Sequence, residues 1–230
     1  MLSGLQRIKR CLLLFFDLIP VVIQIVYGLW RLSKLTHPIV TIFGGSKVQQ
    51  DSEFARQATQ LAQMLVDHDV SVLTGGGPGI MQAANCGAVR EKKGEVRSIG
   101  VGVKGLDENL INICAQEYIA MNYFFARKWL LTQYSVGFAV FPGGFGTLDE
   151  LAEIVTLMQT KKLPPVPIVL ISKTYWKPFM DWVYESALKN NMLKEMDINL
   201  LIVTDDIDEA FKILHSHCVE KMKESPTKLP

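Results

Sequence analysis

The stretch Pro142-Gly143-Gly144-Phe145-Gly146-Thr147-Leu148-Asp149-Glu150 follows the apolar run 136–141 and opens the apolar-periodic segment 151–158. In α/β proteins, a strand, a glycine-rich turn and then a helix commonly hold phosphate. Small residues let backbone N–H groups and a helix N-terminus approach an anion closely. These nine residues therefore predict the floor of a phosphate site.

Two carboxylates, Asp149 and Glu150, lie just inside the helix that this stretch opens. The helix dipole favours an acidic residue in the first turn, which is a sufficient explanation for Asp149. Glu150 follows Thr147 by three residues, the spacing of a capping box, so it could cap the helix. It could equally project toward the group to which the phosphate is attached. The sequence leaves both roles open for Glu150.

From residue 38 onward, short apolar runs alternate with longer amphipathic segments. Their periodicity predicts strands at 39–43, 70–74, 96–103, 118–120, 136–141, 166–171 and 200–203. It predicts helices at 51–67, 80–90, 123–133, 175–189 and 207–218, and one after the glycine-rich stretch that ends near 160, with a loop at 105–112. This alternation predicts an α/β fold, a doubly wound parallel sheet with helices on both faces. We expect an N-terminal helical segment 1–36, one nucleotide-binding domain 37–219 and a loose polar tail 220–230.

Charge and cysteine spacing argue against several classes of protein. The chain has 230 residues, with 24 Lys and Arg against 23 Asp and Glu, and its net charge of +1 gives no footprint for nucleic acid. The four cysteines, Cys11, Cys86, Cys114 and Cys218, show no CxxC spacing, which argues against a zinc knuckle and a secreted disulfide framework. A reducing compartment fits best, so we expect a cytoplasmic protein. The run 215–218 has metal-ligand residue types but ends the last helix without a partner cluster, so we expect no metal.

The apolar segment 11–30 is about as long as a membrane span. Against a span, Asp17 would lie in hydrocarbon, and Pro20 suggests two helices that meet at a bend. The polar residues of this region recur at helical spacings that place them on one narrow stripe: Arg7, Arg10, Asp17, Gln24, Arg31 and Lys34. Three alternatives stay open: a helix packed on the domain or on a second subunit, a membrane-surface contact through residues 1–35, and a true span.

Three glycine-bearing turns follow three expected strands: Gly44-Gly45-Ser46, Gly75-Gly76-Gly77-Pro78-Gly79 and 142–147. Parallel strands end at one edge of the sheet, so these turns converge there, where ligands bind. Ile80 occupies the place of the third small residue of a dinucleotide fingerprint, and no GxxxxGK[ST] motif occurs. The phosphate of a mononucleotide or a sugar is the simpler interpretation.

Arg127 and Lys128 lie on the helix just before the strand that feeds the central glycine run. A basic pair on a helix is ordinarily solvated. Its position near the binding edge nevertheless makes Arg127 a candidate for clamping a phosphate or orienting a carboxylate through its planar fork.

Residues 38–213 resemble the LOG ("lonely guy") family of phosphoribohydrolases, long mislabelled as lysine decarboxylases. The resemblance rests on Phe43-Gly44-Gly45-Ser46, on Thr74-Gly75-Gly76-Gly77-Pro78-Gly79-Ile80-Met81-Gln82-Ala83-Ala84, on Arg127-Lys128, on the PGGxGTxxE run ending at Glu150 and on Gln159. It implies a Rossmann-like fold, a homodimer or larger oligomer, and hydrolysis of nucleoside 5′-monophosphates to a free base and ribose 5-phosphate. The lysines lie in nothing like a pyridoxal phosphate site, so we reject the decarboxylase label and expect no cofactor.

The resemblance also assigns roles to single residues. It makes Arg127 and Glu150 the catalytic pair, and it implies a substrate site formed by Gly44, Ser46, Gly75, Gly76, Gly77, Gly79, Met81, Lys128, Pro142, Gly143, Gly144, Gly146 and Thr147. A carboxylate near C1′ would stabilise the positive charge that builds on ribose, and we expect Arg127 to lower its pKa and hold it ionised.

Two departures from the family pattern leave the preferred base open. Asp149 stands where a glutamate is more usual, and residues 160–162 replace a motif that often carries His. The substrate is expected to be AMP or an N6-modified, cytokinin-type nucleotide. Asp149 is a candidate for protonating the leaving base. A non-catalytic carrier of a phosphorylated nucleotide or cofactor on the same scaffold is the alternative.

Overall fold

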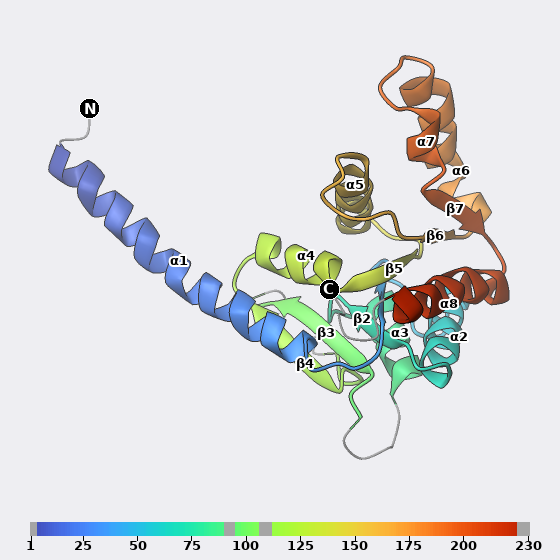
Figure 1. Cartoon of the computed structure of the whole chain (residues 1–230), viewed down its shortest axis with the longest axis horizontal. Coiled ribbons are helices and arrows are strands. Elements are labelled where there is room, and N and C mark those ends of the chain that lie inside the picture. The colour runs from blue at the N-terminus through green and yellow to red at the C-terminus, as the bar shows by residue number, and fades with distance from the viewer. Residues whose placement is uncertain (1–3, 90–94, 106–111, 225–230) are drawn as a thin grey trace.

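The computed structural model describes residues 4–89, 95–105 and 112–224, and it contains a seven-stranded parallel sheet (Figure 1). The strand order is β4-β3-β2-β1-β5-β6-β7. The strands are β1 (Ile39–Phe43), β2 (Ser71–Thr74), β3 (Ser98–Val103), β4 (Glu117–Met121), β5 (Ser135–Val140), β6 (Ile168–Ile171) and β7 (Leu201–Thr204), and each pairs in parallel with its neighbours. The predicted α/β class and doubly wound sheet are confirmed.

Helices cover both faces of the sheet. One face carries α2 (Glu53–Asp67), α3 (Ile80–Ala88) and α8 (Ile207–Glu224), and the other carries α1 (Gly4–Leu32), α4 (Phe124–Gln133), α5 (Phe145–Gln159) and α6 (Lys173–Trp182). Strand β1 supplies both cores because successive side chains point to opposite faces. Val40 and Ile42 join the first core, and Ile39 and Phe43 join the second.

The helix boundaries differ from the sequence prediction in three places. The expected helix 175–189 is α6 followed by a π-helical segment, Val183–Leu188, after which a short α7 (Glu195–Ile198) precedes β7. Helix α8 runs past Cys218 to Glu224, so Cys218 lies inside the helix, and residues 220–224 are helical rather than loose. The rest of the expected tail and most of the expected loop 105–112 lie outside the described residues.

Helix α1 is one continuous helix, and the predicted bend at Pro20 is wrong. Its C-terminal half packs on the domain: Val21 and Leu32 are buried, and the Gly28 backbone lies so close to Leu130 of α4 that a Cβ would clash. Its N-terminal half projects away from the sheet (Figure 1). The segment Ile8–Leu32 is long and apolar enough to cross a membrane.

Cys86 of α3 and Cys114 form a disulfide with a Cα–Cα separation of 4.7 Å, which corrects the expectation of reduced cysteines. Their separation of 28 residues gave no sign of this pairing, because the fold of the intervening strand β3 brings the two residues together. Cys11 is free and exposed, and Cys218 is free and buried.

Candidate active site

The centre of the sheet contains a switch in strand order. From β1 the chain proceeds outward to β2, β3 and β4, and from β5 it proceeds in the opposite direction to β6 and β7. Ligands of open α/β sheets bind outside the carboxyl ends of the strands at this point. The glycine turns after β1 and β5 lie there, as the sequence predicted.

Backbone hydrogen bonds tie the three glycine turns together. The Gly45 N–H donates to the Pro142 carbonyl at 2.9 Å, and the Ile80 N–H donates to the Gly45 carbonyl at 3.1 Å. Gly79 has a φ of +67°, and a Cβ on it would collide with the Gly45 carbonyl. Glycine is therefore required where the second turn meets the first.

The N-terminus of α5 has no side-chain cap. Gly144 is the N-cap and no side chain caps the helix, while a Cβ on Gly144 or on Gly146 would meet nothing within 4 Å. The first N–H groups of a helix have no intrahelical partner, so this end offers donors and a positive dipole end to an anion. Thr147 is buried and lies third in the helix, and its side chain packs against Gly143. A capping box would need Thr147 as the N-cap, but the N-cap is Gly144, so the capping-box alternative for Glu150 is wrong.

The guanidinium of Arg127, which belongs to α4, lies between strand β3, the glycine turn after β2 and helix α5. Its Nε donates to the Val101 carbonyl at 3.0 Å, its Nη2 donates to the Gly75 carbonyl at 3.4 Å, and its Nη1 lies 3.3 Å from Oε1 of Glu150. A Cβ on Gly75 would overlap Nη2, so the absence of a side chain there makes room for the guanidinium. The fork is fixed in orientation by three partners from three elements.

Glu150 is largely buried, with 11% of its side chain exposed. Burial raises its pKa to about 7, although Arg127 and Lys128 act in the opposite direction. The expected lowering by Arg127 is therefore wrong in its net direction, because desolvation outweighs the ion pair. A carboxyl with a pKa near 7 changes charge in the range in which general acids and bases operate.

Lys128 points to the same helix α5 but makes different contacts. Its Nζ lies 2.9 Å from Asp149 and 2.6 Å from Glu153. Burial tends to lower the pKa of Lys128, but hydrogen bonds to Glu153 and Asp149 raise it overall. The ammonium already has two anionic partners, so it links α4 to α5, and Asp149 is held in this ion pair.

The remaining predicted residues surround the same edge. The Gly44 backbone packs against Ile80, Ser46 is exposed beside Gly79, and the Met81 side chain covers Gly75 and Gly77. Gly76 has a φ of +69° and lies against the ring of Tyr118. The structure thus brings the three turns, Arg127 and Glu150 together.

Sequence reasoning missed a buried polar network beneath the second turn. Asn85 of α3 accepts hydrogen bonds from Thr74 and Asn112, and donates to Ser98 at 2.9 Å. Thr74 accepts from the Gly76 N–H, and Asn112 donates to the Gly77 carbonyl at 3.3 Å, so the network holds the glycine turn. A polar residue in a helix otherwise rich in Ala was the signal that could have identified it.

Sequence reasoning also missed Tyr175 of α6. Its hydroxyl donates to the Gly143 carbonyl and so fixes the third turn from the side of α6. No short motif includes Tyr175, which lies 32 residues from Gly143.

Comparisons with known proteins identify relatives of this chain. A family model described as "Possible lysine decarboxylase" matches residues 81–214. A probable cytokinin riboside 5′-monophosphate phosphoribohydrolase of Oryza sativa subsp. japonica is 32% identical over 150 residues, which cover 65% of this chain and 57% of that relative. A cytokinin riboside 5′-monophosphate phosphoribohydrolase of Arabidopsis thaliana is 31% identical over 187 residues, covering 80% of this chain and 85% of the relative.

The fold is also shared with a protein of a different kind. The molybdenum cofactor carrier protein of Chlamydomonas reinhardtii superposes with a TM-score of 0.56 at 21% identity, covering 80% of this chain and 99% of the other. The family model matches more than half of the chain, and the Arabidopsis thaliana relative is matched over most of its length. The protein therefore belongs to the LOG family, whose model carries the description of a possible lysine decarboxylase.

Proposed function

We propose that this protein hydrolyses the N-glycosidic bond of a nucleoside 5′-monophosphate, either AMP or an N6-modified, cytokinin-type nucleotide, to the free base and ribose 5-phosphate. The observation that carries the proposal is the buried pair of Arg127 and Glu150 beside three linked glycine turns. The family relationship supports a phosphoribohydrolase in general.

The proposed chemistry uses Glu150 as a carboxylate. Breaking the C1′–N bond leaves positive charge on the ribosyl ring, which a nearby carboxylate stabilises. Water then adds to C1′, Glu150 takes one of its protons, and the electron pair of the broken bond stays with the base, which takes up a proton. Two carboxylates do comparable work in O-glycoside hydrolysis. Arg127 keeps Glu150 in position through the 3.3 Å ion pair.

The 5′-phosphate is the binding handle in this proposal. It would meet the uncapped N-terminus of α5 and the bare backbone at Gly144 and Gly146. Binding energy from a remote group can be used to orient the reacting centre. Nucleosides that lack the phosphate are therefore expected to react poorly.

The direct test is to incubate the purified protein with AMP and follow free adenine by chromatography. Glu150→Gln keeps the shape of the side chain but removes the carboxylate, so adenine release is expected to fall by at least about 100-fold while AMP binding is largely retained. Glu185→Gln changes an exposed glutamate of the π-helical segment and serves as the matched control. Undiminished turnover in Glu150→Gln would remove this residue from the mechanism.

A non-catalytic carrier is the second candidate, and the fold shared with the molybdenum cofactor carrier favours it. A carrier has no need of a buried Arg127–Glu150 pair, which supports hydrolysis instead. A screen of the common 5′-monophosphates and an isopentenyl-adenine nucleotide, for binding and for base release, distinguishes the two functions. Binding without release of any base would support the carrier. A homodimer or larger oligomer belongs to the main proposal and is tested by sedimentation velocity.

A further inference from the structure

Helix α1 carries a long apolar stripe that no part of the described chain covers. Its residues follow each other at intervals of three or four, the spacing of one helix face. All seven are exposed: Ile8, Leu12, Phe15, Ile19, Val22, Val26 and Trp30. The 29-residue helix is about 43 Å long at about 1.5 Å per residue, and the stripe runs along most of it.

The opposite side of α1 faces the domain. The amide of Gln24 exchanges two hydrogen bonds of 2.9 Å with Asn122, and Nε of Arg31 lies 2.6 Å from Glu117 of β4. Arg10 and Asp17 continue this polar line toward the N-terminus at the same seven-residue spacing. The docked half therefore fixes the rotation of the helix, with polar residues toward the domain and the apolar stripe away from it.

The stripe is wider than a coiled-coil seam. Phe16 and Leu18 are also exposed and flank the stripe on its two sides, so the apolar surface is broad. A strict two-position seam is narrow and is normally flanked by complementary charges. Among the described residues of this half, the exposed charges are Lys9, Arg10 and Asp17, too few to form the paired rows of opposite charge that flank such a seam. The surface fits a bilayer better than a second copy of the helix.

Charge is also distributed unevenly between the N-terminal segment and the rest of the chain. Residues 1–36 contain five basic residues and one acidic residue, a net charge of +4. The whole chain carries +1, so residues 37–230 carry −3. A basic apolar segment on an otherwise acidic protein complements an anionic lipid surface, to which each basic residue near the surface contributes about 1 kcal/mol.

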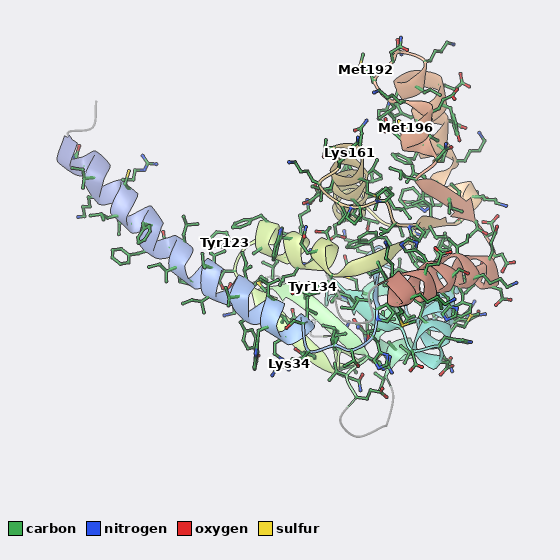
Figure 2. The ribbon with its side chains drawn as sticks, in the orientation of Figure 1. Lys34, Tyr123, Tyr134, Lys161, Met192 and Met196 are labelled. Atoms are coloured by element: carbon green, nitrogen blue, oxygen red, sulfur yellow. A yellow bond between two sulfur atoms is a disulfide. The ribbon has the colours of Figure 1, made fainter. Side chains whose placement is uncertain are left out.

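Aromatic residues lie where α1 meets the domain. Tyr27 and Trp30 are exposed on α1, and Nζ of Lys34 lies 3.3 Å above the Trp30 ring. Exposed Tyr123 begins the turn into α4, next to Asn122, and Figure 2 shows it beside the middle of α1. Trp and Tyr favour the boundary between lipid and water.

We propose that α1 lies flat in the surface of an anionic bilayer, with the stripe from Ile8 to Trp30 in the acyl chains and the domain on the aqueous side. Such a helix binds through its buried apolar face and its attraction to anionic lipid. In this orientation Arg10, Asp17, Gln24 and Arg31 stay out of the hydrocarbon. The proposal is independent of the proposed hydrolysis.

Co-sedimentation of the full chain with vesicles tests the proposal. Binding is expected to vesicles of phosphatidylcholine with 30% phosphatidylglycerol and to be much weaker to phosphatidylcholine alone. Lys9→Gln with Arg10→Gln is expected to weaken partitioning about 30-fold, which corresponds to about 1 kcal/mol for each lost charge. Equal binding to both kinds of vesicle would overturn the anionic preference.

A matched pair of variants tests the orientation. Phe15→Glu places a charge on the stripe, whereas Leu13→Glu places the same charge on the other side of the same exposed helix. Only Phe15→Glu is expected to lower vesicle binding by tenfold or more. Equal losses in the two variants would overturn the flat orientation in favour of a helix that enters lipid on all sides.

Cys11 provides an independent readout, because it is the free exposed cysteine of the described residues. Its reaction with a membrane-impermeant maleimide is expected to slow at least tenfold when anionic vesicles are added, and to recover in Phe15→Glu. Unchanged labelling would overturn the proposal. So would protection that depends on protein concentration without vesicles, because a second copy would then cover the stripe.

Discussion

Glu150 shows how one carboxyl group can be prepared for chemistry by its surroundings. Burial between α4 and α5 raises its pKa, and Arg127 partly offsets this while holding the group in one place. Arg127 is itself fixed by the carbonyls of Val101 and Gly75. The reactivity of the pair therefore depends on backbone atoms of strand β3 and of the glycine turn after β2.

The pH dependence of the reaction follows from this pKa. Glu150 is mainly neutral below pH 7 and mainly a carboxylate above it, and the proposed mechanism needs the carboxylate. We expect kcat/KM for AMP to rise with pH to a plateau, with a midpoint of about 7 that lies above the second ionisation of the phosphate at about 6. Initial rates from pH 5 to 9 measure it. A fall through pH 7 would mean that the protonated group is the active form.

Gly75→Ala tests whether the space beside Gly75 positions the guanidinium of Arg127. The new Cβ would overlap Nη2 of Arg127, so the side chain must move away from Glu150. We expect kcat/KM to fall by about 100-fold, the cost typical of a misplacement of about 1 Å, with little change in the urea midpoint. Activity close to that of the unmodified protein would show that the orientation of Arg127 does not matter.

Gly146→Ala is expected to separate stability from binding. The site is open in the free protein, and Ala is a better helix former than Gly, so unfolding should cost about 0.5 to 1 kcal/mol more. If phosphate approaches the bare backbone there, the KM for AMP rises at least about tenfold, because the methyl group occupies the approach. Calorimetry and steady-state kinetics measure the two effects. An unchanged KM would place the phosphate elsewhere.

Single residues differ in how far the sequence could predict them. The convergence of the glycine turns could be predicted, because turn chemistry and the shared edge of a parallel sheet depend on local patterns. The pairing of Arg127 with Glu150 was implied by the family resemblance alone. The partners of Lys128 and the hydroxyl of Tyr175 could not, because they depend on how helices pack. The direction of the Glu150 pKa shift was predicted wrongly for the same reason, because burial is a property of the packed molecule.

Helices α4 and α5 are joined by two neighbouring ion-pair sites, one at Arg127 and one at Lys128. Lys128 also lines a small recess with Phe43, Leu131 and Glu150. This arrangement sets the distance between the helices and hence the placement of Glu150. Lys128 is therefore expected to act through the position of α5 rather than by touching the substrate.

Lys128→Met distinguishes these two roles. Methionine is unbranched and only one atom shorter than lysine but carries no charge, so kcat should fall about tenfold with KM nearly unchanged, and stability should fall by about 1 kcal/mol. Lys177→Met is the control, because Lys177 pairs with Asp181 within α6 and both side chains are exposed. A rise in KM alone would return Lys128 to the substrate site.

Most strands and helices matched the prediction within a few residues, because the alternation of apolar runs reports burial on both faces of the sheet. The exceptions have identifiable causes. Helix α1 continues through Pro20 although proline donates no backbone hydrogen bond, and the carbonyl that loses this donor lies on an exposed part of the helix. The π-helical segment after Trp182 has no distinct periodicity over its six residues.

Helix α1 has a half that packs on the domain and a half that projects from it. The packed half lies on the N-terminal side of the domain boundary expected at residue 36. Val21 and Leu32 belong to the same core as the helices α4 and α5. In Figure 2, Met192 and Met196 lie at the end of the molecule opposite to α1. The division of the chain into residues 1–36 and 37–219 stays a prediction.

Two truncations test it. Removal of residues 1–20 deletes no side chain that the structure describes as buried, so we expect the free energy of unfolding to change by less than about 0.5 kcal/mol. Removal of residues 1–34 also deletes the buried Val21 and Leu32, each worth about 1.5 to 3 kcal/mol. Urea unfolding of both shortened chains measures the difference. Equal stability would mean that the docked half contributes nothing to the fold.

The polar network at Asn85 has a consequence for the divergence of this sequence over time. Thr74, Ser98 and Asn112 each satisfy a hydrogen-bonding group of Asn85, so an apolar replacement at any one position leaves buried groups without partners. Such a change becomes tolerable only when the others change with it. Across homologues, these four positions should therefore be inherited as a set, and hybrids that mix two such sets should fold poorly even when each parent is stable.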